Sequence, residues 1–403
     1  MSSHSTRNLT LLFWVNFFGT ISFLQPVLTL FYVKNGLNEA DILIILMCWS
    51  GAVFIGEIPT GVFADAYGAR NAFLIGAIIK ISSIGILLMA DSLTMFMLFS
   101  ILNGLSVTFF SGADEALIYE SLKKDKNHHK MDEVMGKIQS AGFIAMMIAV
   151  LVGSFLAKDL QSEQFQLLIL FSLISYIIEF ILLLFIREPS GKVEVKGTSL
   201  QNVIEGIQVI KKAPQLLFLF LNLTLVFIPT VAVFQKFDQP LMINAGLPVY
   251  IIGPIYAVGA LLAFFSSRSI NMLHRNFSYK VLMYFSGFLS ACGLVVAAIF
   301  QNQLWVILFV VLFLRWVGAI RYPIYSKLSN DLIPSHIRAT TISLLSILDS
   351  VFDLVVFTLL TLFATSGIQG ILIGSAIVAL IGSTLPIQIN KRRAKLGSSL
   401  MNR

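Results

Sequence analysis

The chain has 403 residues, of which 57% are hydrophobic and only 12% are charged, and its mean hydropathy is +0.86. Soluble domains carry about 25% charged residues, so this composition excludes an ordinary water-soluble enzyme, a disordered chain and a disulfide-rich secreted scaffold. The two cysteines, Cys48 and Cys292, each lie in an apolar run and predict no disulfide framework. We therefore predict an all-α polytopic membrane protein.

Apolar stretches long enough to cross a bilayer recur along the whole chain. A helix needs about 20 mostly apolar residues to cross a hydrocarbon core of about 30 Å. The segments that meet this requirement are 9–33, 40–63, 71–90, 93–119, 134–157, 165–186, 214–235, 248–270, 279–300, 303–325, 340–364 and 368–389. The first is longer than a signal-peptide core and carries Asn16, Gln25 and Pro26, so we expect it to remain as a span. The sequence predicts twelve transmembrane helices.

The basic residues of the loops predict the orientation. The chain has 28 Lys and Arg against 21 Asp and Glu, a formal net charge of +7. With a cytoplasmic amino terminus and an even number of spans, only Lys34, Lys158 and Lys236 fall in outer loops, and basic loops stay on the cytoplasmic side. We expect an integral plasma membrane protein of a bacterial inner membrane, with both termini cytoplasmic. The basic excess then requires no nucleic-acid partner.

The two halves of the chain show traces of one repeated pattern. I-Y-E-S-L at 118–122 aligns with I-Y-S-K-L at 324–328, and the same offset places Asp65 over Asn271. The longest polar interruption, 187–213, separates six apolar segments from six others. Parallel repeats of this kind occur in transporters. The sequence predicts an N-terminal six-helix bundle over 1–186, a central cytoplasmic linker over 187–213 and a C-terminal six-helix bundle over 214–403, related by pseudo-symmetry.

The second span ends in the most specific motif, G-V-F-A-D-A-Y-G-A-R, which contains Gly61, Asp65, Gly68 and Arg70. Glycines permit tight turns and close helix approach, and the acid and base can pair with groups on neighbouring helices. This motif resembles the signature loop of the major facilitator superfamily of secondary transporters, and the layout of spans resembles that family over essentially the whole chain. The resemblance implies that Asp65 and Arg70 act in a conformational latch between two rocking bundles.

The sequence departs from the resembled family at three places. Ala66 follows the aspartate where a base is usual, and Asn103 precedes Gly104 where many members carry an arginine. The fifth span lacks the Gly-Pro pair of many drug antiporters. These departures weaken an assignment to drug–proton antiporters. Glu57 lies one turn before Gly61 and is either a second member of the latch or part of a hydrogen bond between the second and eleventh spans.

Several charged residues lie within or close to predicted spans, where a charge at the bilayer centre costs about 2.5 to 3.5 kcal/mol on insertion scales. Each such charge requires a partner, a wet cavity or a proton. The candidates for proton coupling or charge pairing are Asp114, Glu115, Asp349, Asp353, Arg315, Arg321 and Lys80.

Asp349 and Asp353 are four residues apart and therefore share one helix face. We expect both to face the interior, either near a cation such as Arg315 or with one carboxyl group protonated. Repulsion between two carboxylates favours a proton on one of them, which suits proton coupling. A static ion pair that ties helices together is the alternative.

Asp114 and Glu115 are adjacent and point about 100° apart around a helix axis. The repeat offset aligns Arg321 with Glu115, which predicts a charge pair between the two halves. Lys80 is expected to pair with an acid, either Glu57 or one in the fourth span. Amide side chains in the first and seventh spans would line a central cavity if those helices face the pore as in the resembled family; they are Asn16, Gln25, Asn222 and Gln235.

These observations favour a secondary transporter that exports a small amphipathic organic solute coupled to proton entry, as a monomer in the lipid bilayer. A proton symporter or facilitator that imports a nutrient is the alternative. A membrane enzyme or a sensor is disfavoured, because the sequence offers no metal cluster, no nucleotide-binding loop and no sizeable soluble domain. We expect neither a cofactor nor a metal site.

Overall fold

The computed structural model describes residues 3–124, 131–187, 211, 214–333 and 338–387, which form helices and short connections without a strand. Twelve helical segments of this part of the chain are long and apolar enough to cross a membrane. They coincide with the twelve segments found in the sequence, so the predicted fold class is confirmed.

The chain divides into two compact units. Unit 1 comprises Met1–Val195 and Met242–Ala257, and unit 2 comprises Lys196–Leu241 and Val258–Arg403. Residues 242–257 therefore belong with unit 1 by their contacts, although the sequence places them in the C-terminal half. Nearly all of the expected linker, 187–213, lies outside the described residues.

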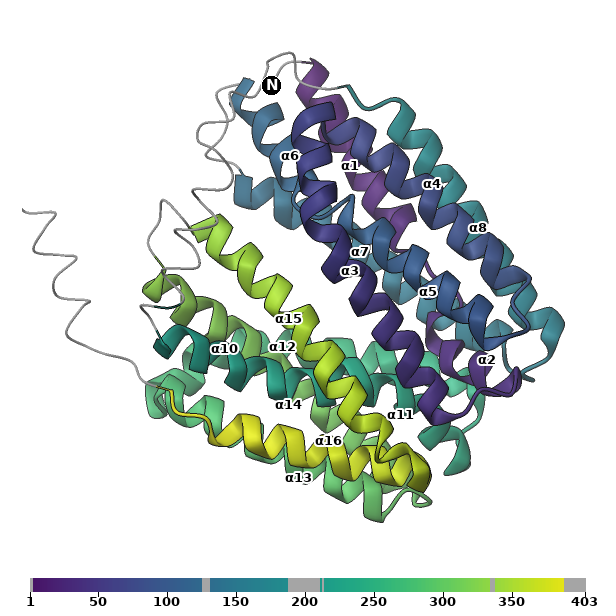
Figure 1. Cartoon of the computed structure of the whole chain (residues 1–403), viewed down its shortest axis with the longest axis vertical. Coiled ribbons are helices and arrows are strands. Elements are labelled where there is room, and N and C mark those ends of the chain that lie inside the picture. The colour runs from purple at the N-terminus through teal and green to yellow at the C-terminus, as the bar shows by residue number, and fades with distance from the viewer. Residues whose placement is uncertain (1–2, 125–130, 188–210, 212–213, 334–337, 388–403) are drawn as a thin grey trace, which may run out of the picture. The chain divides into compact units, whose positions relative to one another are not determined.

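Unit 1 holds the first six spans. Its elements are α1 (Ser3–Thr20), η1 (Gln25–Val27), α2 (Leu28–Lys34), α3 (Glu39–Tyr67), α4 (Ala69–Leu88), α5 (Leu93–Thr108), α6 (Ala113–Lys124), α7 (Met131–Leu156), α8 (Ser162–Leu184) and η4 (Val249–Ile251). Helix α4 packs on α5 and α8, and α1 packs on α7 and α8 (Figure 1). The first and fourth spans are interrupted, by a turn before Pro26 and by Gly112, whose φ of 73° suits glycine.

Unit 2 holds most of the remaining spans. Its elements are α10 (Pro214–Phe227), the π-helix η3 (Ile228–Val233), α11 (Phe234–Asn244), α12 (Ile252–Asn276), α13 (Tyr279–Ile299), α14 (Leu304–Leu332), α15 (Arg338–Thr361), η6 (Ala364–Ser366) and α16 (Gly367–Thr384), with the end of α11 and the start of α12 in unit 1. Helix α13 packs on α14 and α16 (Figure 1). The seventh span runs to Asn244, so Lys236 lies within it and not in the outer loop that we expected.

The helices expose apolar side chains outward and use small residues inward. Ile55 and Trp305 are 72% and 81% exposed, as expected for residues that face lipid. A Cβ on Gly104 would lie only 2.6 Å from the Trp49 carbonyl oxygen, so the backbones of α3 and α5 approach closely there. Lipid tails are as apolar as the helix surfaces, so there is little hydrophobic force between helices in a membrane, and close packing of this kind holds them together instead.

Candidate functional site

Helices α1, α4 and α8 bring a buried ion pair together in unit 1. Lys80 Nζ lies 2.9 Å from Glu179 Oε2 and donates a 2.7 Å hydrogen bond to the carbonyl oxygen of Gly19. The side chain of Lys80 is 15% exposed and that of Glu179 is 3% exposed. The ammonium also lies 4.3 Å from the ring centre of Tyr176 and 5.8 Å from that of Phe110, within cation–π range. The cation is thus surrounded by a carboxylate, a carbonyl and two rings.

Gly19 makes this arrangement sterically possible. A Cβ built on Gly19 would collide with the carboxyl group of Glu179. A larger residue at position 19 would therefore force the Glu179 carboxyl group to move from its place between α1 and Lys80. The sequence pattern does not reveal this requirement, because it depends on the approach of α1 to α8.

The partner of Lys80 differs from the expectation. We expected Glu57 or an acid of the fourth span, whereas the structure pairs Lys80 with Glu179. Glu57 instead accepts a 2.8 Å hydrogen bond from Ser111 Oγ. The reason is packing: α4 lies along α8, so the face that carries Lys80 meets the face that carries Glu179.

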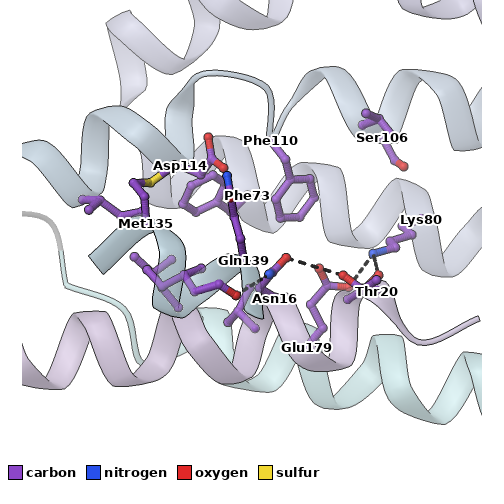
Figure 2. Close-up of a pocket in the computed structure, with 16 residues that line it drawn as sticks. Asn16, Thr20, Phe73, Lys80, Ser106, Phe110, Asp114, Met135, Gln139 and Glu179 are labelled. Atoms are coloured by element: carbon purple, nitrogen blue, oxygen red, sulfur yellow. Dashed lines mark hydrogen bonds and ion pairs between the residues drawn. The ribbon is translucent and has the colours of Figure 1, made fainter. Parts of the chain in front are cut away.

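The ion pair lines a pocket of about 250 Å³ within unit 1 (Figure 2). Its polar lining consists of Asn16, Thr20, Lys80, Ser106, Asp114, Gln139 and Glu179. Two aromatic rings, Phe73 and Phe110, also line it and stack with centres 5.3 Å apart. Ligand pockets commonly combine apolar walls with a few polar groups that fix orientation. The pocket can therefore hold a small molecule with an apolar body and a polar end.

The four expected cavity amides have different surroundings. Asn16 lines the pocket and donates a 2.7 Å hydrogen bond to the Ile138 carbonyl oxygen on α7. Asn222 is fully buried and donates to the carbonyl oxygen of Gly382 on α16. Gln25 is exposed and Gln235 is half-buried. Of the four, Asn16 is the one that the structure places at this pocket.

Asp114 and Glu115 begin α6 and are both exposed. Asp114 Oδ1 accepts a 2.8 Å hydrogen bond from the backbone N–H of Glu115, and Asp114 lines the pocket whereas Glu115 does not. The two adjacent acids therefore face different surroundings, as their spacing predicts.

The residues of the signature motif lie at the junction of α3 and α4. Helix α3 continues through Asp65, which is exposed, and ends at Gly68, whose φ of 89° requires glycine. Arg70 donates a 3.0 Å hydrogen bond to the Leu184 carbonyl oxygen at the end of α8. A Cβ on Gly61 would meet no described atom within 4 Å, so Gly61 is not needed for a close contact here.

In unit 2, Arg315, which we named as one possible partner of Asp349 and Asp353, belongs to a second ion pair. Arg315 pairs with Asp238 at 2.9 Å, and the Asp238 side chain is fully buried. Asp349 instead accepts a 2.7 Å hydrogen bond from Thr224 Oγ1. Asp353 lies one turn further along α15 and is half-buried. Asp238 escaped notice in the sequence because the seventh span was expected to end before it.

Arg321 lies inside α14 with 2% exposure. Its terminal nitrogens donate to Asn222, to Ser286 Oγ and to the Met283 carbonyl oxygen over distances of 2.6 to 3.0 Å. These acceptors are neutral and all belong to unit 2. The expected charge pair of Arg321 with Glu115 would join the two units and stays a prediction.

No group of three or more His, Cys, Asp or Glu side chains suited to a metal ion occurs among the residues that the structure describes. Gln139 and the stacked Phe73 and Phe110 also line the pocket, although no pattern in the sequence indicated them. Phenylalanine is so abundant in this chain, at 34 residues, that its spacing carries little information about a pocket.

Comparisons with known proteins agree with this architecture. The family model described as Major Facilitator Superfamily matches residues 9–356. A relative from Bacillus subtilis (strain 168), "Uncharacterized MFS-type transporter YxaM", is 23% identical over 246 residues, which span 59% of this chain and 59% of the relative.

Solved structures share the fold at low sequence identity. The nucleoside transporter NupG has a TM-score of 0.72 at 15% identity, with 94% of this chain and 97% of that chain covered. A D-xylose–proton symporter has a TM-score of 0.70 at 15% identity, with the same coverage of 94% and 97%. A bacterial homologue of the human lysosomal transporter Spinster has a TM-score of 0.71 at 14% identity, with 96% and 95% covered. At these identities the similarity shows the fold alone.

Proposed function

Because the chain belongs to the major facilitator superfamily, we propose that it is a secondary active transporter that exports a small amphipathic organic solute in exchange for protons. Members of this fold carry their cargo by alternating access around a site between two bundles. The family and the fold are those of transporters and not of enzymes. We place the protein in a bacterial inner membrane, as a monomer with both termini in the cytoplasm.

The observation that carries the proposal is the Lys80–Glu179 pair on the wall of the unit 1 pocket. Removing two charges from water costs several kcal/mol per ion even after relaxation. Such a pair at membrane depth is a functional-site hypothesis by default. Here one partner can take up a proton and the pocket beside it can hold a solute.

Proton binding at Glu179 would convert the carboxylate into a neutral acid and release the ammonium of Lys80. A solute that places a cationic or donor group on Glu179 competes with that proton for the same oxygens. Competition for one group is what exchange requires, because arrival of the proton expels the solute. The stacked Phe73 and Phe110 would hold the apolar body of the solute.

Other titratable groups have supporting roles in the proposal. Asp114 lines the same pocket and offers a second proton acceptor. Asp349, with Asp353 one turn away, is the corresponding candidate in unit 2. Asp65 and Arg70, with Gly61, Gly68 and Glu57, are proposed to form the latch that alternates between states.

The alternative is import of a nutrient by a proton symporter or facilitator. The similar folds of a D-xylose–proton symporter and of a nucleoside transporter support it. In that case an anionic or acceptor group of the solute would bind Lys80 after a proton has neutralised Glu179. Proton and solute would then bind together and move in one direction. Exchange and symport therefore predict opposite effects of a proton on solute affinity.

The test uses purified protein in vesicles with an imposed pH gradient and a panel of amphipathic cations and anions. Exchange predicts that acidifying the side opposite to the solute drives its uphill movement, and that Glu179→Gln reduces this movement to the rate without a gradient. Glu163→Gln, an exposed acid at the start of the same helix, is the matched control and should keep full coupling.

Two results would contradict the proposal. Flux that persists unchanged after collapse of the gradient in the unaltered protein removes proton coupling. Flux that is unaltered in Asp114→Asn, Glu115→Gln, Asp349→Asn and Glu179→Gln variants removes the carboxylates as coupling groups. Uphill movement of the solute in the direction of proton flow favours the import alternative.

A further inference from the structure

Three arginines gather at one end of unit 1, at a pocket that shares no lining residue with the pocket beside the Lys80–Glu179 pair. Arg7, Arg70 and Arg187 line a pocket of about 480 Å³ together with Asn71 and the end of α8. None of the described residues that line it is acidic. They come from the start of α1, the start of α4 and the segment after α8, so three distant parts of the sequence converge there.

Specific contacts hold these arginines in place. The Asn8 side chain donates a 2.7 Å hydrogen bond to the Arg187 carbonyl oxygen and accepts one of 3.2 Å from its N–H. These two hydrogen bonds fix the start of α1 against the chain after α8, so that Arg7 and Arg187 lie at the same pocket. Arg70 is fixed by its hydrogen bond to the Leu184 carbonyl oxygen.

We infer that this pocket binds the phosphate headgroup of an anionic phospholipid. Guanidinium groups match phosphate oxygens with paired, charge-assisted hydrogen bonds. Three like charges around one pocket repel each other, and an anion between them relieves that repulsion. The first turn of α4, which carries Arg70 and Asn71, adds the positive end of a helix dipole.

The surface beside the pocket favours a lipid over free phosphate. Ile174, Ile177, Ile181 and Leu184 are all exposed, and their spacing places them along one face of α8. This apolar stripe ends at the pocket, where Leu184 and the exposed Phe185 form part of the lining. An acyl chain can lie along the stripe while its headgroup phosphate reaches the arginines. Basic pockets at span ends are known sites for anionic headgroups.

The experiment uses the full chain, stripped of lipid in detergent, and follows binding by native mass spectrometry and by the melting temperature. Three probes are titrated separately: phosphatidylglycerol, phosphatidylcholine and inorganic phosphate. We expect phosphatidylglycerol to bind and stabilise the protein, and the other two probes to do so far more weakly.

Variants locate the site. The double variant Arg7→Gln, Arg187→Gln is expected to weaken phosphatidylglycerol binding about 30-fold, since each basic residue contributes about 1 kcal/mol to attraction of anionic lipid. Arg275→Gln, which removes an exposed arginine at the end of α12 in unit 2, should leave binding unchanged. The double variant Arg7→Lys, Arg187→Lys keeps the charge but loses the paired geometry, so it should bind more tightly than the glutamine variant and less tightly than the unaltered protein. This series separates loss of charge from loss of folding.

Three outcomes would overturn the inference. Equal binding of phosphatidylcholine would show that the apolar stripe alone is responsible. Equal stabilisation by inorganic phosphate would show an anion site without a lipid. Equal loss in Arg275→Gln and in the double variant would show general surface attraction and no defined pocket.

Discussion

The two units each bring a buried cation to the backbone of their first helix, but they neutralise it differently. In unit 1, Lys80 of α4 reaches the Gly19 carbonyl oxygen of α1 and is balanced by Glu179 at a pocket. In unit 2, Arg321 of α14 reaches the carbonyl oxygen of Asn222 on α10, and the oxygens that accept its hydrogen bonds are neutral.

The repeat offset makes this comparison sharper. It aligns Asn16 with Asn222, and it aligns Lys80 with Ser286, to which Arg321 donates. The cation near these aligned positions therefore comes from α4 in unit 1, as Lys80, and from α14 in unit 2, as Arg321. A charge with a carboxylate beside a pocket can respond to a proton or a solute, whereas a guanidinium held by neutral oxygens is a structural tie. We propose on this basis that unit 1 serves coupling and that the Arg321 contacts of unit 2 serve rigidity.

The largest effect is expected when the buried pair of unit 2 is broken. Asp238→Asn removes the negative charge of a fully buried carboxylate that pairs with Arg315, which costs about 3–5 kcal/mol of folding free energy. Glu179→Gln should cost less, because Lys80 faces a pocket and keeps its carbonyl partner. Thermal unfolding in detergent measures both, with Glu163→Gln as the control. Equal losses in the two variants would show that the pocket and the carbonyl partner do not lessen the cost of removing the Glu179 charge.

A smaller effect is expected at the close approach of α1 and α8. Gly19→Ala forces the Glu179 carboxyl group to move, an overpacking that costs about 1–3 kcal/mol. Coupling of transport to the pH gradient should fall with it. Gly85→Ala is the matched control, since a Cβ there meets nothing within 4 Å. Full coupling in Gly19→Ala would show that the position of Glu179 is not critical.

The hydrogen bond between α10 and α15 is expected to contribute about 1 kcal/mol. Thr224→Val removes the donor to Asp349 while nearly preserving volume. Unfolding in detergent should show this loss, whereas Thr361→Val, at a half-buried position whose hydroxyl bonds within its own helix, should show a smaller one. No difference between these two variants would mean that Asp349 gains an equivalent donor.

The smallest effect on stability is expected at Gly61. Alanine is favoured over glycine in a helix by up to about 1 kcal/mol, and the added Cβ has open space, so Gly61→Ala should be neutral or slightly stabilising. Gly318→Ala in α14 is the matched control. If Gly61 serves the latch, transport falls in Gly61→Ala alone. Unchanged transport would confine the latch to the other motif residues.

Periodicity and hydropathy in the sequence were sufficient to predict the twelve spans, because lipid requires long apolar helices and little else satisfies that requirement. The pairing of charges was not predictable from the same pattern. The sequence predicts an acidic partner for Lys80. That this partner is Glu179 depends on which face of α4 meets α8 and on the absence of a Cβ at Gly19. Those are properties of packing between distant segments.

The π-helix of the seventh span determines which way its second half faces. Asp238 follows Asn222 by 16 residues, so a regular α-helix would point the two side chains about 160° apart. The wide turn of η3 absorbs about one residue, which reduces this angle to about 60° and lets both side chains reach α14. Deletion of one residue from 228–233 would therefore preserve the angle of about 60° between the Asn222 and Asp238 side chains, because the segment would become a regular α-helix. Deletion of one residue between Asn222 and Asp238 from α10 or α11 would leave the π-helix in place and rotate the two side chains relative to each other by about 100°.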